Sequence, residues 1–334
     1  MILYIIGSDN MRKISLFLLI LFIPFYINAK EVKLNNIVPR NENAGSVMEV
    51  LKSKDGNYVI TSLNRNTHAD GGIAVLEKRD PNGKLIWEVV YGTSTTTSMI
   101  EFSSMAITKD DSIVIAGYFN ETDDIGLENN GLYDGLLIKF DKDGNLLWQK
   151  NWGGSSHDFF NEMVLDQQDN IYVTGIYNST DIDTIENNGQ RDSIVLKYDQ
   201  SGNQLWAKSV SGSKEDCIQY LSIDNKNNLL LTAYSKSPEV NGLTLNGDKN
   251  LLTLKYDTNG NIVWFKKIML DKNSFSYKSH MTSDFGYLQA ASATTTEFDD
   301  ITLNGQRDIV IVKYDTNGNI LWKKIGAVVK MKRY

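Results

Sequence analysis

The chain has 334 residues, of which 41% are hydrophobic and 22% are charged, and its formal net charge is −7. These values are typical of a folded globular protein, and a single Cys excludes a disulfide framework, a cysteine-based zinc site and a CxxC redox centre. The acidic balance argues against a nucleic-acid partner, because phosphate binding requires clustered Lys and Arg. The length suits either two ordinary domains or one large all-β domain.

The N-terminal segment has the pattern of an export signal. A basic pair at 12–13 precedes an apolar run at 14–27, and the small residue Ala29 follows at a plausible cleavage point. The run is shorter than the about 20 apolar residues that a membrane-spanning helix needs, although an uncleaved anchor stays open as an alternative. We expect a signal peptide over 1–29, with Met11 as the better initiator. The mature protein is then exported to the periplasm, cell surface or extracellular space, with no integral membrane span.

Internal repetition is the strongest signal in the sequence. Five of the six Trp residues end copies of one motif, which reads EKRDPNGKLIW in the first copy and VKYDTNGNILW in the last. The copies recur about every 58 residues, and only the first interval is slightly longer. The five positions are Trp87, Trp148, Trp206, Trp264 and Trp322.

Two further features keep this period. A small residue recurs at the end of an apolar run, at Gly117, Gly175, Ala233 and Ala291, and Ser62 stands at this position in the first copy. An Asn-Gly pair is followed three residues later by Asp134, Asp192, Asn250 and Asp308. The whole repeat is therefore one structural unit and not a short motif on an unrelated fold.

Each repeat is predicted to form four short strands. In the third copy these are 162–165, 171–177, 193–198 and 204–209, which are short runs rich in Ile, Val, Tyr and Trp between Asp/Asn/Gly turns. Four antiparallel strands in serial units are typical of a β-propeller. We therefore expect an all-β fold, a β-propeller of four-stranded antiparallel blades with five repeats.

The predicted domain boundaries follow from the repeats. The propeller occupies 45–326, after the signal peptide at 1–29 and a lead-in at 30–44. A short tail at 327–334 fits no strand of the pattern.

Residues that recur in every repeat are interpreted as architectural. The Trp is expected to fill the wedge between blades, and the small residue to mark a place where sheets approach closely. A Lys precedes each turn Asp by two residues and is expected to pair with a carboxylate at the exposed blade edge, a contact of about 0–1 kcal/mol. The five lysines are Lys78, Lys139, Lys197, Lys255 and Lys313.

The string WGGSSHD at 152–158, followed by EMVLDQQDNIYVTG and SIVLKYDQSGNQLW, resembles the bacterial SBBP-type β-propeller repeat. The resemblance covers about residues 45–326. It implies a propeller in an exported or cell-envelope protein and implies no common set of catalytic residues. The family's name refers to seven blades, whereas five repeats are present here.

Several common site chemistries lack support. The Asp-rich turn at 141–145 has no distant bidentate Glu, as a calcium loop of the EF-hand kind requires. His68, His157 and His280 fall at different positions of the repeat, and no GxSxG, HExxH or P-loop pattern is present. Cys217 is expected to be buried in the apolar start of a strand. We expect no metal, no cofactor and no catalytic residues.

One position differs from repeat to repeat. The first strand of a propeller blade lines the central channel, and the residue 13 positions before the small residue falls on it. The five residues are Glu49, Ser104, Glu162, Tyr220 and Lys278, with His280 two residues beyond the last. Such groups can bind a sugar or a cation, or act as acid and base if the carboxyl groups are about 5–10 Å apart. The candidate ligand-binding residues are Glu49, Glu162, Tyr220, Lys278 and His280, although a solvated channel mouth is polar without any function.

Three functions remain open. The first is a monomeric, non-catalytic binding or scaffolding module that takes a protein or glycan partner through the channel mouth and the variable loops at 178–190 and 235–246. The second is a carbohydrate-active enzyme that uses Glu49 and Glu162. The third is an envelope-assembly scaffold, because D-x-x-G-x-x-x-W is similar to the docking motif of quinoprotein-type propellers and of an outer-membrane assembly lipoprotein. Here the Asp-to-Gly spacing is one residue shorter and the lipid-anchor Cys is missing.

Overall fold

The computed structural model describes most of the repeat region. The described residues are 46–65, 72–92, 99–120, 125–182, 185, 187, 191–245, 249–270, 275–284, 286–293, 297–298, 301–302 and 308–326. The predicted signal peptide (1–29), lead-in (30–44) and tail (327–334) lie outside these residues.

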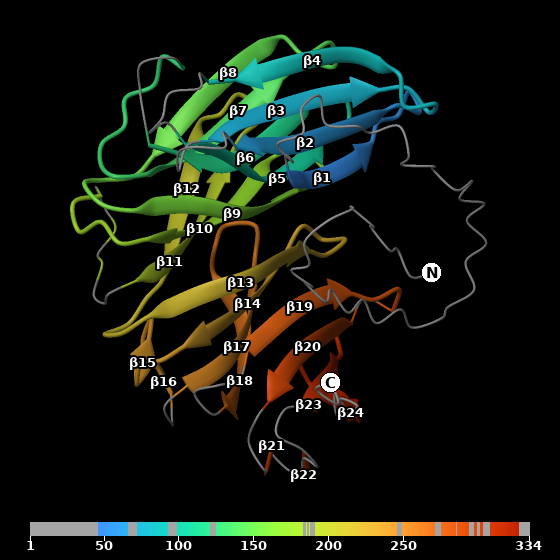
Figure 1. The fold of residues 1–334 in the computed structure, drawn as a ribbon. Coiled ribbons are helices and arrows are strands. Elements are labelled where there is room, and N and C mark those ends of the chain that lie inside the picture. The colour runs from blue at the N-terminus through green and yellow to red at the C-terminus, as the bar shows by residue number, and fades with distance from the viewer. Residues whose placement is uncertain are drawn as a thin grey trace, which may run out of the picture. The chain divides into compact units, whose positions relative to one another are not determined.

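Five four-stranded sheets follow one another along the chain, and the strands of each lie side by side in sequence order (Figure 1). Sheet 1 contains β1 (Ser46–Lys52), β2 (Tyr58–Arg65), β3 (Gly72–Arg79) and β4 (Leu85–Tyr91). Sheet 2 contains β5 (Ile100–Ile107), β6 (Ile113–Phe119), β7 (Asp134–Phe140) and β8 (Leu146–Trp152). Sheet 3 contains β9 (Asp158–Leu165), β10 (Ile171–Tyr177), β11 (Asp192–Tyr198) and β12 (Gln204–Val210). Sheet 4 contains β13 (Asp216–Ile223), β14 (Leu229–Ser235), β17 (Lys249–Tyr256) and β18 (Ile262–Leu270). Sheet 5 contains β19 (Phe275–Met281), β20 (Tyr287–Ala293), β23 (Asp308–Tyr314) and β24 (Ile320–Gly326).

All neighbouring strands within these sheets are antiparallel. Two small hairpins, β15 (Glu239–Val240) with β16 (Leu243–Thr244) and β21 (Glu297–Phe298) with β22 (Ile301–Thr302), stand in the second-to-third-strand loops of sheets 4 and 5. The all-β fold and the four strands per repeat are therefore confirmed. In the third repeat β10 has the predicted bounds, whereas β9 begins four residues early because Asp158 still pairs with Tyr177. No helix in the described part of the chain is long and apolar enough to cross a bilayer.

The hydrophobic core lies between successive sheets. Four buried clusters each combine side chains of two neighbouring sheets, such as Leu137 of sheet 2 with Val173 of sheet 3. The third strands β7 and β11 are buried at every position, because both of their faces are covered by neighbouring sheets. This explains why these strands read as continuous apolar runs instead of alternating ones.

Each of the first four recurrent Trp residues joins its sheet to the next one. The indole Nε1 donates a hydrogen bond to the backbone carbonyl of the residue after the turn Asp of the following sheet. The pairs are Trp87 to Lys142 (3.3 Å), Trp148 to Gln200 (3.1 Å), Trp206 to Thr258 (3.1 Å) and Trp264 to Thr316 (3.3 Å). The turn glycine allows this contact, since Gly202 has φ 79° and an added Cβ would lie 3.1 Å from the Trp148 ring. We call this arrangement the Trp joint, and it supports the architectural interpretation of the Trp series.

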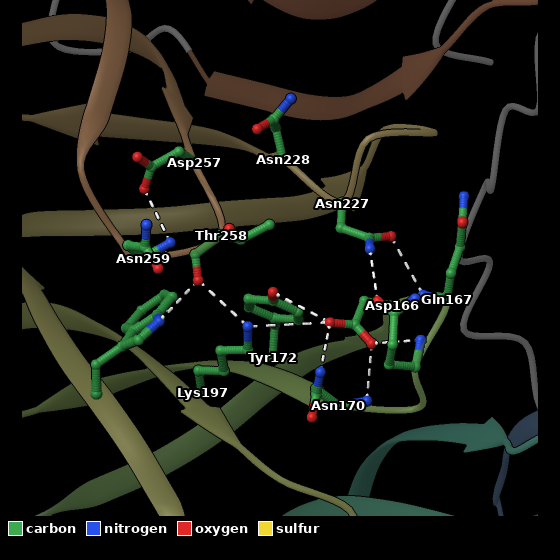
Figure 2. A network of polar contacts seen from close by, with 12 residues as sticks. Asp166, Gln167, Asn170, Tyr172, Lys197, Asn227, Asn228, Asp257, Thr258 and Asn259 are labelled. Atoms are coloured by element: carbon green, nitrogen blue, oxygen red, sulfur yellow. Dashed lines mark hydrogen bonds and ion pairs between the residues drawn. The ribbon is translucent and has the colours of Figure 1, made fainter.

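The recurrent lysines belong to the same joint, and their predicted exposure was wrong. They are only 5–8% exposed. In four of the sheets their partner is the Asp of the first turn of their own sheet and not the turn Asp two residues later. Figure 2 shows the joint between sheets 3 and 4, where the Lys197 Nζ lies 4.0 Å from Asp166 and donates to the Thr258 carbonyl at 3.2 Å. Each lysine thus pairs with a carboxylate of its own sheet, donates to a carbonyl of the next sheet, or does both.

The close approach that requires a small residue occurs within a sheet and not between sheets. An added Cβ at Gly117 would lie 2.0 Å from the Glu101 carbonyl oxygen, and one at Gly175 would lie 2.3 Å from that of Phe159. Both carbonyls belong to the first strand of the same sheet, next to an irregularity in the strand pairing. In sheets 4 and 5 this position holds the buried Ala233 and Ala291.

Candidate binding site on the first strands

The first strands of successive sheets contact one another: β1 with β5, β5 with β9, β9 with β13, and β13 with β19. Each of them contains a β-bulge, and the candidate residue comes directly after it. The register shifts lie before Glu49, Ser104, Glu162, Tyr220 and Lys278. A bulge bends the strand and changes the direction in which the next side chain points. The same backbone feature therefore presents a different side chain from sheet to sheet.

The first two of these side chains reach the first strand of the next sheet. The Glu49 carboxylate accepts a hydrogen bond from the backbone N–H of Met105 at 2.6 Å, and the Ser104 hydroxyl accepts one from that of Met163 at 3.2 Å. Both donors come directly after the candidate residue of their own sheet. Glu49 and Ser104 consequently contribute to the contact between sheets as well as to the polar surface there.

Tyr220 interacts electrostatically with two of the other candidates, Glu49 and Glu162. Burial raises the pKa of its phenol, and the negative charges of Glu162 and Glu49 raise that pKa further. Carboxylates from sheets 1 and 3 thus act on a phenol in sheet 4, although the three residues are far apart in the sequence. A phenol with a raised pKa stays protonated near neutral pH, so it can donate a hydrogen bond while the carboxylates accept.

All five ligand-binding assignments stay predictions, and the structure says least about the last two candidates. Lys278 pairs with Ala290 in the register of β19 and β20, and its side chain lies outside the described residues. His280 is an exposed residue of β19, opposite Leu288.

The other residues considered for chemistry have plain surroundings. Cys217 is buried in β13 as predicted, and burial raises the pKa of its thiol. Such a thiol is a poor nucleophile, because only the thiolate reacts. Within the described residues no group of three or more His, Cys, Asp or Glu is arranged to hold a metal ion.

One feature of the structure had no residue-level signal in the sequence. A pocket of about 230 Å³ lies between sheets 3 and 4, and its lining includes Lys208 of β12 and Asn241 of the β15–β16 hairpin. Lys208 follows the repeat Trp by two residues, and lysines occupy the equivalent position in other sheets. Its position in the repeat therefore gave no reason to choose it as a candidate site residue. The only indication was that the loops at 178–190 and 235–246 differ most between repeats, and both contribute to this pocket.

Comparison with known proteins gives weak similarities. No family model matches the sequence. An uncharacterized WD repeat-containing protein of Acanthamoeba polyphaga mimivirus is 23% identical over an alignment that covers 55% of this chain and 18% of that protein, so the chain spans less than a fifth of this relative's length.

Similar solved structures include a protein of unknown function from Bacteroides caccae, with 10% identity over 85% of this chain and 83% of that chain and a TM-score of 0.42. They also include a Synechocystis apocarotenoid oxygenase mutant, with 12% identity over 88% and 67% and a TM-score of 0.48. Scores this low support no argument about function. The chain is a repeat-built all-β protein with weak sequence similarity to a WD repeat-containing protein.

Proposed function

We propose that this chain is an exported, non-catalytic β-propeller that binds a hydroxyl-rich or cationic partner, such as a glycan, at the mouth formed by its first strands. The observation that carries the proposal is that Glu49, Glu162 and Tyr220 occupy the same position after the bulge on first strands that contact one another in series, and that both carboxylates act on the Tyr220 phenol. Export rests on the leader-like segment at 1–29, and the SBBP-type resemblance is consistent with an exported propeller.

The distribution of chemistry over the repeat supports a binding role. Positions that recur in every sheet are occupied by the Trp joint, the buried lysines and the turns, and these contacts hold sheets together. The position after the first-strand bulge instead carries a carboxylate, a hydroxyl, a carboxylate, a phenol and an ammonium group in turn. Carboxylates accept hydrogen bonds from sugar hydroxyls and attract ammonium groups, and the Tyr220 hydroxyl donates.

If these five sheets close into a ring, a fifth Trp joint is expected between sheet 5 and sheet 1. In the four observed joints the Trp donates to the residue after the turn Asp of the next sheet. The matching pair for closure is Trp322 of sheet 5 and the carbonyl of Pro81, which follows Asp80 in sheet 1. Trp322 is 37% exposed, so its ring still offers surface for such a contact.

A glycan array tests the binding role. Residues 30–334 are applied as wild type, as Glu49→Gln, Glu162→Gln and Tyr220→Phe, and as Glu88→Gln, an exposed carboxylate of β4 that serves as the matched control. The amide oxygen that Glu49→Gln introduces can still accept from Met105, so this variant keeps the fold. We expect binding of neutral or amino sugars that weakens at least tenfold in the three site variants and is unchanged in the control. A wild type that binds no glycan, or site variants that bind as well as the control, would contradict the proposal.

The same variants test the alternative that the protein is a carbohydrate-active enzyme. If the wild type cleaves a polysaccharide and both Glu→Gln changes abolish cleavage, the two carboxylates act as acid and base and the non-catalytic assignment is wrong. Binding without any product identifies the module as a binding protein.

A further inference from the structure

The pocket between sheets 3 and 4 is lined by residues of both sheets and of two loops. It is lined by Lys208 and Ser209 of β12, by Tyr256 and Ile262 of sheet 4, and by Ile185 and Asn241 of the two variable loops. Asn241 has φ 50° and precedes Gly242 at φ 78°, which closes the tight turn between β15 and β16.

Three contacts fix this hairpin to the end of sheet 3. The Asn241 side-chain oxygen accepts from the Ser211 N–H at 3.1 Å, and its amide nitrogen donates to the Ser209 carbonyl at 2.9 Å. Val240 forms a bridge with Gly212 and is fully buried. The pocket wall is therefore held in place by sheet 3 as well as by sheet 4.

The Lys208 ammonium group gives the pocket its charge. The stem of Lys208 lies over the turn of sheet 4, where its Cε is 3.0 Å from an ideal Cβ on Gly260. Whereas Lys197 and Lys255 pair with aspartates, no carboxylate of the described residues lies within ion-pair distance of Lys208. In a chain with a net charge of −7, this is a cation beside a pocket without a counter-ion from the described part of the protein.

We propose that this pocket binds the carboxylate of a small organic acid or of a peptide C-terminus. The Lys208 ammonium group pairs with the ligand carboxylate. The Asn241 amide uses one hydrogen for the bond to Ser209, and its second hydrogen donates to the same carboxylate. Ile185 and Ile262 contact the apolar part of the ligand. A volume of about 230 Å³ is below that of drug-sized sites, which favours a single small acid or one terminal residue. This site is separate from the first strands, and its occupancy does not depend on the function proposed above.

The repeat supplies a matched control for Lys208. Lys150 and Lys266 also follow the repeat Trp by two residues, in β8 and β18. The hairpin that bonds to Ser209 and Ser211 in sheet 3 belongs to sheet 4, and the pocket is lined by that hairpin. Lys150 therefore keeps the charge and the strand position of Lys208 without this wall.

Saturation-transfer NMR on residues 30–334 tests the site with acetate, lactate, succinate and the peptide Gly-Gly-Leu, the last with a free and with an amidated C-terminus. We expect at least one free carboxylate to bind with a millimolar or lower Kd. Lys208→Met should weaken binding at least tenfold, while Lys208→Arg should stay within about threefold of the wild type and Lys150→Met should not change it. Binding of the free peptide but not of its amide, with weak binding of the small acids, identifies a peptide terminus as the ligand, and the reverse identifies a small acid.

Two results would overturn this assignment. The first is that none of the free carboxylates binds the wild type at millimolar concentration. The second is that Lys208→Met binds as well as Lys150→Met does. Met keeps the apolar stem that packs on Gly260, so thermal unfolding of both variants should match the wild type and loss of binding will not reflect loss of the fold.

Discussion

The Trp joints and the first strands follow opposite rules within one repeat. The four observed joints use the same donor, the same acceptor position and distances of 3.1–3.3 Å, although their turn residues differ. The first strands share a bulge, yet the side chain that follows it varies from sheet to sheet. A repeat protein can thus fix its backbone and its joints and leave one position per unit for other use. The predictions below either break the joints or change the variable position.

The largest effect is expected from breaking a Trp joint. Trp206→Ala removes an aromatic ring that packs on Tyr172 and Gly260. It also removes the hydrogen bond to the Thr258 carbonyl (Figure 2 shows Tyr172 and Thr258). Loss of a large packed aromatic side chain costs about 3–5 kcal/mol. Urea unfolding monitored by circular dichroism should show this decrease in the free energy of unfolding. A decrease below about 1 kcal/mol, the size of an average substitution, would mean that the joint contributes little.

Replacement of the buried lysine of a joint should have the second-largest effect and lower the free energy of unfolding by about 3 kcal/mol. Lys255→Met leaves the buried Asp224 carboxylate without its cation, and removing one partner of a buried pair is strongly destabilising. Although burial alone would raise the pKa of Asp224, the hydrogen bond from Lys255 holds it below its usual value. This contribution is therefore full above the unfolded-state pKa and is lost as the pH falls through the lower folded-state pKa. The double variant Lys255→Met, Asp224→Asn should recover most of the stability at neutral pH, and failure to do so would contradict this explanation.

The closing joint should have a smaller effect of about 2 kcal/mol. If the ring closes through Trp322 and Pro81, Trp322→Ala lowers the free energy of unfolding by loss of ring burial and one hydrogen bond. The effect is expected below that of Trp206→Ala because Trp322 is 37% exposed. A change within about 0.5 kcal/mol, as for an ordinary surface substitution, would show that Trp322 docks on no other sheet in solution.

Asp134 should show the opposite sign of pH dependence to Asp224. An ideal Cβ on Gly153 would lie 2.4 Å from the Asp134 Oδ1 and 3.0 Å from the Asp158 Oδ2, so two buried carboxylates of sheets 2 and 3 are close neighbours. Burial raises the pKa of Asp134, and the charge of Asp158 raises it further. A raised folded-state pKa contributes stability below the unfolded-state value that is lost as the pH rises through the folded-state value.

Asp134→Asn is therefore expected to stabilise the protein by about 1 kcal/mol at pH 7, since it removes a buried negative charge and the unpartnered oxygen Oδ1. The gain should disappear as the pH is lowered below the ordinary range of a carboxyl group. Urea unfolding at neutral and at acidic pH measures both values. A gain that is equal at the two pH values would exclude ionisation of Asp134 as its cause.

Substitution at the variable position should have the smallest effect on stability. Tyr220→Phe removes one hydroxyl from a half-buried side chain, and we expect the free energy of unfolding to change by less than about 1 kcal/mol. Glycan binding should nevertheless weaken at least tenfold. A variant that unfolds much more easily would place Tyr220 among the architectural residues.

The repeat made most of the fold predictable. The motif D-x-x-G-x-x-x-W indicated the third and fourth strands of each sheet and the turn between them, because these contacts are local and recur five times. The partner of Lys197 was not predictable in the same way. Asp166 lies in the first turn of the sheet and meets this lysine only after the sheet has formed, so the nearer turn Asp199 was an equally reasonable partner.

The candidate site was predictable in position but not in detail. Counting along the repeat placed Glu49, Glu162 and Tyr220 on equivalent first-strand positions, and the structure shows that a bulge precedes each of them. The hydrogen bond from Met105 to Glu49 depends on the packing of two sheets, which no local pattern records. The pocket beside Lys208 depends on a hairpin from the next sheet and was missed for the same reason.

The central claim is that recurring positions build the protein and the variable first-strand position binds its partner. The most direct measurement combines glycan-array binding with urea unfolding for Tyr220→Phe, Glu162→Gln and Lys255→Met. The account predicts lost binding with nearly unchanged stability for the first two variants, and lower stability with retained binding, at temperatures where it is folded, for Lys255→Met. Retained binding in both first-strand variants, or a wild type that binds no glycan, would contradict it.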